Sequence, residues 1–165
     1  MGSQQIRRAR RGDLAVLPAD LGPPYYFLDR FDRQEQGLGA LLIAWRDDRP
    51  IGVLYIWLEP AEEPEIREHL PGTPLLTHLE IHTKHRKQGT GTKLIKDAER
   101  RLRLLGHRRV ALAVEENNSR AAKLYTRLGY EEWPHPTVKC YAIADEEGNL
   151  EIEFCRVLVK ALPRE

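Results

Sequence analysis

The sequence predicts a mixed α/β fold in which helices alternate with strands only in the middle of the chain. Paired apolar runs predict two hairpins: ALLIAW and IGVLYIWLE flank a polar turn at residues 46–50, and KCYAIA and LEIEFCRVLV flank another at 145–149. Between the hairpins, the runs LLTHLEIH and RVALAV are each followed by a segment of helical period. This order predicts a mixed sheet of about seven strands flanked by about four helices.

The N-terminal third opens with a short strand at residues 6–9, followed by a helical turn from about residue 12 to 21. Gly22, Pro23 and Pro24 end that turn, and a second helix is expected over residues 25–36. The first hairpin follows this helix. Residues 60–74 then carry four prolines and four glutamates, which predicts a loop with at most one helical turn.

The central part changes period at Thr92. Apolar residues recur there at helical spacing up to Leu105, and Gly106 stands where a left-handed C-terminal residue belongs. After the strand RVALAV, Asn117 and Asn118 supply the N-cap of a further helix. Gly129 ends that helix, whose inner face is expected to consist of Ala121, Leu124 and Leu128.

Composition excludes several classes of protein. The 165 residues suit a single domain, and 26 Lys and Arg against 25 Asp and Glu create no global field for nucleic acid or an anionic membrane. The arginine-rich run at residues 6–11 is interpreted as a solvated first strand. No apolar run reaches membrane-spanning length and no apolar signal segment opens the chain, so we expect a cytoplasmic protein with Cys140 and Cys155 reduced.

The stretch HRKQGTGTKLI, residues 85–95, lies between a predicted strand and a predicted helix. A P-loop requires a glycine five residues before a Gly-Lys pair, and a dinucleotide fingerprint requires a third glycine where Leu94 stands, so both patterns fail. Arg86-x-x-Gly89-x-Gly91 remains. Glycines allow the backbone to turn tightly and direct successive N–H groups at one point, and the positive end of the helix behind them suits a pyrophosphate.

A second motif lies in the segment NNSRAAKLYTRLGYEEW. Asn118, Ala121, Leu124, Tyr125 and Gly129-Tyr130 follow the pattern Asn-x-x-Ala-x-x-Leu-Tyr-x-x-x-Gly-Tyr. Together with the glycine stretch, this segment resembles the GCN5-related N-acetyltransferase (GNAT) superfamily. The resemblance is specific over residues 76–131, and the order of elements extends it to one domain over residues 1–165.

The resemblance implies a mostly antiparallel sheet with a splayed parallel pair in its middle, formed by LLTHLEIH and RVALAV. It also implies acetyl-CoA as co-substrate, with pantetheine pairing along the backbone of the first of these strands. Tyr125 matches the general acid that protonates the departing thiolate. The implied cofactor-binding residues are Leu79, Glu80, Ile81, Arg86, Lys87, Gln88, Gly89, Thr90, Gly91, Thr92 and Asn118, the last of which is also a helix cap.

The general base is not assigned. Relatives with a base on this strand carry it at positions matching Leu75 and Thr77, and neither side chain accepts a proton at neutral pH. Strand alternation places His78 and Glu80 on the face opposite Thr77 unless a bulge re-aims one of them. Proton removal is otherwise left to a water chain, to a substrate of low pKa or to an acid from elsewhere.

His78, Glu80, His82 and His85 fit no standard zinc spacing, and no metal is expected. The carboxylates of residues 60–74 form either a solvated acidic loop or a rim that attracts a cationic amine.

We therefore expect direct acetyl transfer to the primary amine of a small cationic molecule, such as an antibiotic, an amino-sugar or an amino-acid-like compound. The alternatives are a protein N-terminal or lysine acetyltransferase and a non-catalytic acyl-CoA-sensing module. Besides the amine, we expect no nucleic-acid or membrane partner, and a monomer or homodimer.

Overall fold

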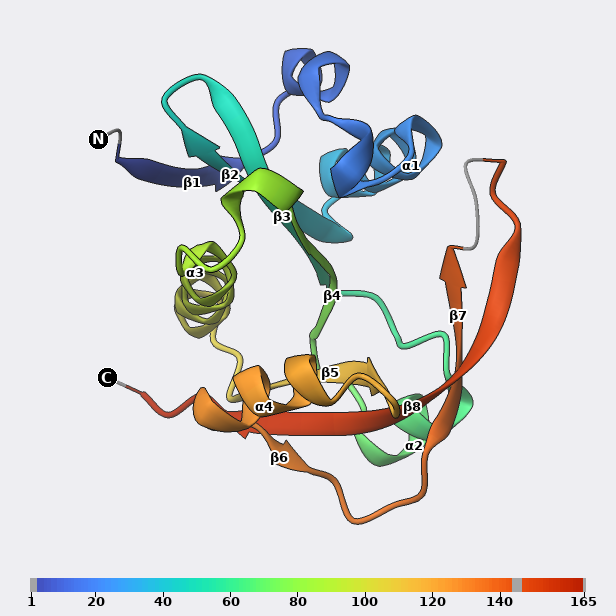
Figure 1. Ribbon diagram of the computed structural model, residues 1–165. Coiled ribbons are helices and arrows are strands. Elements are labelled where there is room, and N and C mark those ends of the chain that lie inside the picture. The colour runs from blue at the N-terminus through green and yellow to red at the C-terminus, as the bar shows by residue number, and fades with distance from the viewer. Residues whose placement is uncertain (1–2, 144–146, 165) are drawn as a thin grey trace. The chain divides into compact units, whose positions relative to one another are not determined.

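The computed structural model describes residues 3–143 and 147–164 of the chain (Figure 1). Its helices and strands appear in the order β1 Gln4–Arg8, η1 Arg11–Val16, η2 Ala19–Leu21, α1 Pro24–Glu35, β2 Gly39–Arg46, β3 Arg49–Trp57, α2 Pro64–His69, β4 Leu75–Ile81, η3 Thr83–His85, α3 Thr90–Leu104, β5 Arg109–Glu115, α4 Ser119–Arg127, β6 Glu131–Glu132, β7 Val138–Ile143 and β8 Leu150–Ala161. The elements labelled η are short 3₁₀ helices. The predicted mixed α/β class is confirmed, and the described residues contain eight strands.

The chain divides into two compact units, the first of which comprises the chain up to Trp57 and residues 76–101. Its strands lie in the order β1-β2-β3-β4, and β2 pairs with both β1 and β3 in antiparallel register. α1 buries Phe27 and Phe31, while the Gln34 amide accepts a hydrogen bond from the Leu41 N–H at 2.9 Å and donates one to the Ala9 carbonyl at 3.0 Å. These bonds fix α1 to β2 and give both the oxygen and the nitrogen of the buried Gln34 amide a partner.

The same unit holds α3, whose apolar residues recur at helical spacing as predicted: Leu94, Ile95 and Ala98 are fully buried. Gly52 on β3 permits the close packing, because a Cβ there would lie 2.9 Å from the Ile81 side chain and 3.2 Å from that of Leu94. A larger residue at position 52 would therefore push α3 away from the strands that carry the candidate site.

The second unit comprises residues 58–75 and 102–165. β8 is its longest strand and pairs in antiparallel register with β5, β6 and β7. The chain entering β4 also belongs to this unit: the Ala111 N–H of β5 donates to the Pro74 carbonyl at 3.0 Å, just before Leu75 begins β4.

Several boundaries differ from those predicted. The expected turn at residues 12–21 is two short 3₁₀ helices, and the loop at 60–74 contains α2, which begins at Pro64. α3 begins at Thr90, two residues before the expected change of period, and the short strand β6 was not predicted. Part of the turn at 145–149 lies outside the described residues.

The arginine-rich start forms part of this framework. Arg7 pairs with Asp13 at 2.8 Å, and its guanidinium lies 4.4 Å from the centre of the Trp45 ring. The run therefore includes a side chain engaged in packing, in addition to the exposed Arg8, Arg10 and Arg11. Within the described part of the chain, no helix is long and apolar enough to cross a membrane.

Candidate active site

The glycine stretch forms a tight, exposed turn between η3 and α3 in the first unit. Lys87 and Gly89 have φ angles of 64° and 77°, in the left-handed region that glycine adopts without strain. Residues 86–89 are all exposed, and Thr90 at the start of α3 is buried. The conformation of Gly89 is thus one that a glycine adopts easily, in keeping with the tight turn expected from the sequence.

The first turn of α3 contains the rest of the predicted cradle. The Lys93 N–H donates to the Gly89 carbonyl at 3.0 Å, which begins the helical pattern and leaves the N–H groups of Thr90, Gly91 and Thr92 without a helical carbonyl to bond. Thr90 is held by its side chain, which donates to the Gln4 side chain at 3.1 Å. Thr90 as a whole residue is buried, whereas Gly91 and Thr92 are half-buried.

Gly91 has space beside it. A Cβ at this position would meet one neighbouring heavy atom within 4 Å, the Leu79 Cδ2 at 3.8 Å, which is an ordinary contact. The protein's own packing therefore does not require a glycine at position 91. The open space leaves room for a ligand to approach the backbone.

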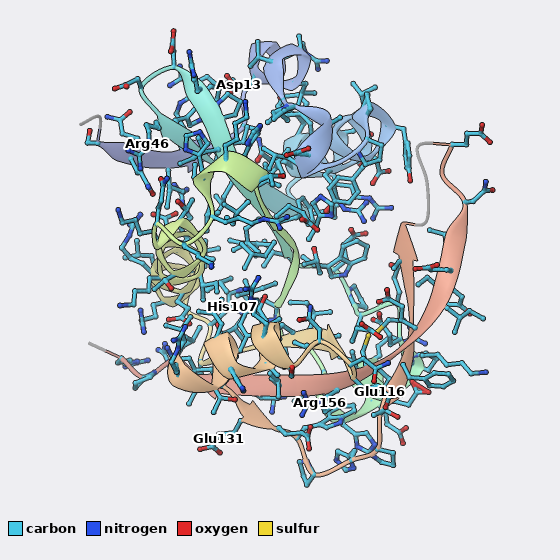
Figure 2. All side chains as sticks on the ribbon, viewed as in Figure 1. Asp13, Arg46, His107, Glu116, Glu131 and Arg156 are labelled. Atoms are coloured by element: carbon cyan, nitrogen blue, oxygen red, sulfur yellow. The ribbon has the colours of Figure 1, made fainter. Side chains whose placement is uncertain are left out.

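The charge around the turn is positive. Arg86 donates from Nε to the Ile81 carbonyl at 3.4 Å, and Arg46, at the end of β2 and labelled in Figure 2, donates to the Gln88 side chain at 2.7 Å. Lys84 and Lys87 are also exposed nearby in the chain. Four basic side chains and the N-terminus of a fifteen-residue helix together favour a bound anion.

His78 lies within β4 with a φ angle of 53°, in the left-handed region, and this irregularity of the extended backbone is here called the bulge. The sequence analysis named an irregularity of the strand as the condition for re-aiming the His78 side chain, and the backbone of His78 has such an irregularity. Its ring stacks on that of Tyr26, with centroids 4.1 Å apart, and its Nε2 lies 2.6 Å from the Leu21 carbonyl oxygen. Because a carbonyl only accepts, Nε2 carries the hydrogen and Nδ1 keeps the lone pair of the neutral ring.

The titratable groups of β4 respond to their burial. Desolvation lowers the pKa of His78, partly opposed by its hydrogen bond to the Leu21 carbonyl. Burial also raises the pKa of the Glu80 carboxyl, and the nearby Arg86 charge opposes that rise. Thr77 donates to the Tyr55 carbonyl at 3.2 Å, and Leu75 is buried, in keeping with the absence of a base at either position.

The second motif lies in the second unit. Asn118 is the N-cap of α4 and accepts a hydrogen bond from the Ala121 N–H at 3.1 Å, as predicted for a cap. Tyr125 is half-buried on the same helix, and its ring meets that of Tyr130 edge-on, with centroids 5.8 Å apart. Gly129 ends the helix with a φ of 98°. The structure thus gathers residues 79–92 in the first unit and holds Asn118 and Tyr125 on one helix of the second.

The acidic segment is only partly solvated. Glu62, Glu65 and Glu68 are exposed, whereas Glu63 is half-buried next to Cys140, and burial raises its pKa. Arg67 holds the segment by donating to the Ala61 carbonyl at 2.6 Å. Among the residues that the structure describes, no three His, Cys, Asp or Glu side chains come close enough to hold a metal ion.

The second unit also contains an open pocket of about 430 Å³ lined by α2, β6 and the adjoining ends of β5 and β8. The rings of His69 and His135 stack across it at 3.6 Å, with the edge of Trp133 against them. No predicted site residue lines this pocket. Its residues come from four separate segments, so no local pattern in the sequence indicated it.

The fold and the two motifs define an acyltransferase that uses a coenzyme A thioester. A family model described as the acetyltransferase (GNAT) family matches residues 6–130, about three quarters of the chain. The chain belongs to this family, and it is accordingly an acetyl-CoA-dependent N-acetyltransferase. The predicted family and class of enzyme are confirmed.

Solved structures share the fold at low sequence identity. The ribosomal-protein-S18-alanine N-acetyltransferase from Escherichia coli is 13% identical, with a TM-score of 0.70 over 99% of this chain and 96% of that one. A putative phosphinothricin N-acetyltransferase is 20% identical, with a TM-score of 0.64 over 98% and 100%. The PaiA N-acetyltransferase from Thermoplasma acidophilum, solved with coenzyme A, is 16% identical, with a TM-score of 0.66 over 96% and 99%. No curated protein matches the sequence.

Proposed function

We propose that the enzyme acetylates the primary amine of a small cationic molecule. The observation that carries this proposal is the row of exposed carboxylates Glu62, Glu65 and Glu68, on the segment that contains the short helix α2. Such a group attracts an ammonium ion, and its position before β4 suits a wall of the acceptor site. The similarity to a putative phosphinothricin N-acetyltransferase supports a small acceptor.

Residues 79–81, residues 86–92 and Asn118 would hold acetyl-CoA, which supplies the acetyl group as an activated thioester. In this proposal the backbone N–H groups of residues 87–92 bind the diphosphate, helped by the positive end of α3. The exposed left-handed turn at Lys87 and Gly89 and the open space beside Gly91 fit such a group. The backbone of Leu79, Glu80 and Ile81 pairs with pantetheine as an added strand does.

Two groups of the chain then act on the reacting atoms. The backbone N–H that follows the bulge, at Leu79, stabilises negative charge on the carbonyl oxygen. As the bond from the amine nitrogen to the acetyl carbon forms and the C–S bond breaks, the Tyr125 hydroxyl protonates the departing sulfur, and the proton that the amine gives up restores the hydroxyl, whose ordinary pKa of about 10 exceeds the value near 8.5 of a thiol. Positioning of the amine, with no covalent enzyme intermediate, supplies most of the remaining rate enhancement.

Gly91→Ala tests the proposed cradle. The new methyl group meets only an ordinary contact and suits a helix, so we expect stability to be unchanged or raised by up to about 1 kcal/mol. We expect the dissociation constant for coenzyme A to rise by about tenfold or more, because the methyl group keeps the diphosphate from the backbone. Isothermal titration calorimetry and thermal unfolding measure the two effects.

Gly12→Ala is the matched control, since a Cβ there also finds open space and the residue lies far from the turn in sequence. We expect it to bind coenzyme A like the wild type. If Gly91→Ala binds coenzyme A with unchanged affinity, the diphosphate does not approach this backbone and the proposed cradle is wrong.

The acceptor is identified by incubating the enzyme with acetyl-CoA and a panel of polyamines, aminoglycosides, amino acids and peptides. We expect mass spectrometry to detect acetylation of small polycationic amines in preference to peptides. Preferential acetylation of peptide N-termini would replace the small-molecule proposal with a protein acceptor, the class named in the ribosomal-protein relative.

A further inference from the structure

His78 occupies an unusual point of the backbone in β4. Its φ angle of 53° belongs to the left-handed region, which few residues other than glycine adopt and in which residues of active sites are enriched. Gly22, which follows η2, makes room for the side chain, because a Cβ at position 22 would lie 2.9 Å from the His78 Nε2. The backbone of two separate segments thus accommodates a single imidazole.

Three contacts within the first unit hold this ring in place. The Nε2 atom lies 2.6 Å from the Leu21 carbonyl oxygen and donates to it. The Tyr26 ring stacks on the imidazole with centroids 4.1 Å apart, and the Phe27 ring meets it edge-on at 6.1 Å. The imidazole of His78 therefore has a fixed orientation and carries its hydrogen on Nε2.

The other ring nitrogen, Nδ1, is free to accept a proton. In this tautomer Nδ1 has the lone pair, and the hydrogen bond that the His78 ring makes within the described residues goes through Nε2. Nδ1 is not one of the side-chain atoms that the described residues enclose completely and leave without a partner, so solvent reaches it. A proton taken up at Nδ1 can therefore pass on to water.

The groups that face the ring keep it neutral. Desolvation lowers the pKa of His78, its bond to the Leu21 carbonyl partly opposes this, and the Arg30 charge on α1 adds to the lowering. Tyr26 also faces the ring, and because burial raises its pKa, it stays an uncharged phenol. On the same strand, burial raises the pKa of the Glu80 carboxyl. The imidazole is thus in the form that accepts a proton at neutral pH.

The chain position of His78 brings this acceptor close to the reacting atoms of the proposed function. There the Leu79 N–H binds the thioester carbonyl oxygen, and this amide directly follows His78 in the chain. The attacking nitrogen must come within about 3–3.5 Å of the carbonyl carbon, which brings it within reach of the preceding side chain, directly or through one water. Leu75 and Thr77 offer no competing base, since Leu75 is apolar and the Thr77 hydroxyl donates to a backbone carbonyl.

We infer that His78 is the general base that removes a proton from the ammonium form of the acceptor. This inference rests on the proposed function, because it takes Leu79 as the group that binds the carbonyl oxygen. An N–H bond of the ammonium breaks, Nδ1 gains the proton, and solvent water takes the proton from the imidazolium. The neutral amine then attacks, and its second proton restores the Tyr125 hydroxyl. Each turnover releases one proton to solvent.

The basicity of the acceptor tests this inference. An amine of pKa near 10.4 arrives as an ammonium ion and needs a base, whereas an analogue with fluorine beside the amine has a much lower pKa and arrives neutral. We expect His78→Asn, which tolerates the positive φ, to lower kcat/KM about 100-fold for the ordinary amine and by less than about threefold for the fluorinated one. A purely structural role would lower both values equally.

The pH dependence of kcat/KM gives a second measurement, which the wild type alone provides. For the ordinary amine, we expect the wild-type value to rise with pH and level off above the His78 pKa. The value for His78→Asn should keep rising about tenfold per pH unit towards the pKa of the amine, because only solvent then removes the proton. The deficit of the variant should therefore shrink at high pH.

His107→Asn is the matched control, since His107 is a half-buried histidine of the second unit whose pKa is also lowered by burial. We expect it to give the wild-type ratio for the two acceptors. Both acceptors derive from the best amine of the panel, small molecule or peptide, so an unexpected acceptor class contradicts the proposed function and leaves this test intact. Equal losses for the two acceptors in His78→Asn, or a wild-type profile without a plateau, would overturn the assignment of His78.

Discussion

At the scale of single residues, Tyr125 is the group whose chemistry is most open to test. Tyr125→Phe removes the hydroxyl but keeps the ring that meets Tyr130 edge-on, so the packing of α4 is retained. We expect kcat to fall by about 100-fold, the typical contribution of a general acid, with the coenzyme A dissociation constant unchanged. Thiol release with an acetylated amine measures the first quantity, and calorimetry the second.

Tyr141→Phe, which removes a hydroxyl from an exposed tyrosine of the second unit, is the control for Tyr125→Phe and should retain full kcat. Equal loss of kcat and of coenzyme A affinity in Tyr125→Phe would assign the hydroxyl to binding. Unchanged kcat would remove it from the proposed mechanism.

His78 links the bulge in β4 to the pH dependence of stability. Because burial lowers its pKa below the value of about 6.5 in an unfolded chain, the unfolded state takes up the proton first as pH falls. His78 therefore stabilises the fold above that pH, and its contribution is lost as pH falls through the folded-state pKa. We expect His78→Asn, whose side chain tolerates a positive φ, to unfold with a shallower loss of stability below pH 6.5.

Urea unfolding of wild type and His78→Asn at a series of pH values measures this difference. Tyr26, which stacks on the ring, and Arg30, whose charge also disfavours an imidazolium, are present in both proteins and cancel in the comparison. Parallel pH profiles for the two proteins would show that His78 titrates alike in the folded and unfolded states.

At the scale of elements, the features that depend only on neighbouring residues could be predicted from the sequence, whereas those that depend on contacts with distant residues could not. The ends of α3 and α4 were predicted correctly at Gly106 and Gly129, because a left-handed C-terminal residue requires only its own backbone. The bulge at His78 depends on contacts with Leu21 and Tyr26, more than fifty residues earlier, and no pattern within β4 reveals it. β6 is two residues long and exists through its pairing with Val159 and Leu158.

The first residue of α3, which lies within the candidate site, was also not predicted from the local sequence pattern. The helical period becomes visible at Thr92, since Gly89, Thr90 and Gly91 carry no apolar side chain that repeats. The helix nevertheless begins at Thr90, where the buried side chain reaches Gln4 on β1. The sequence therefore predicted a turn before the helix, but not that Gly91 and Thr92, two residues of the proposed cradle, belong to the first turn of the helix.

Asn118, the N-cap of α4, has two proposed roles, which are capping the helix and contacting pantetheine, and substitutions can separate them. Asn118→Ala removes the cap and should lower the free energy of unfolding by about 1 kcal/mol, whereas Asn118→Ser keeps a cap and should restore most of it. We expect both variants to bind coenzyme A several-fold more weakly, because neither has the amide proposed to contact pantetheine. Wild-type affinity in Asn118→Ser would limit Asn118 to capping.

At the scale of the whole molecule, the balance of charge makes any attraction of the acceptor a local effect. The formal net charge is +1, so the protein as a whole neither attracts nor repels a cation appreciably. Attraction of a cationic acceptor must then come from a cluster, and the acidic segment that contains Glu62 and Glu63 is the candidate. The contribution of such a cluster is screened within about 8–10 Å at physiological ionic strength.

Glu62→Gln combined with Glu63→Gln should therefore raise KM for a cationic acceptor at low salt, by several-fold, and leave KM for acetyl-CoA unchanged. The exposed Glu62 should account for most of the effect, because burial raises the pKa of Glu63 and favours its neutral form. Adding salt should raise the KM of the wild type for the cationic acceptor until it equals that of the variant. Salt screens the electrostatic attraction that the substitution abolishes. Steady-state kinetics at low and high ionic strength measure this convergence, with Glu131→Gln, an exposed carboxylate on β6, as the control. A KM that is unchanged at low salt would assign these carboxylates to solvation of the segment, and recognition of the amine would then have to come from uncharged groups.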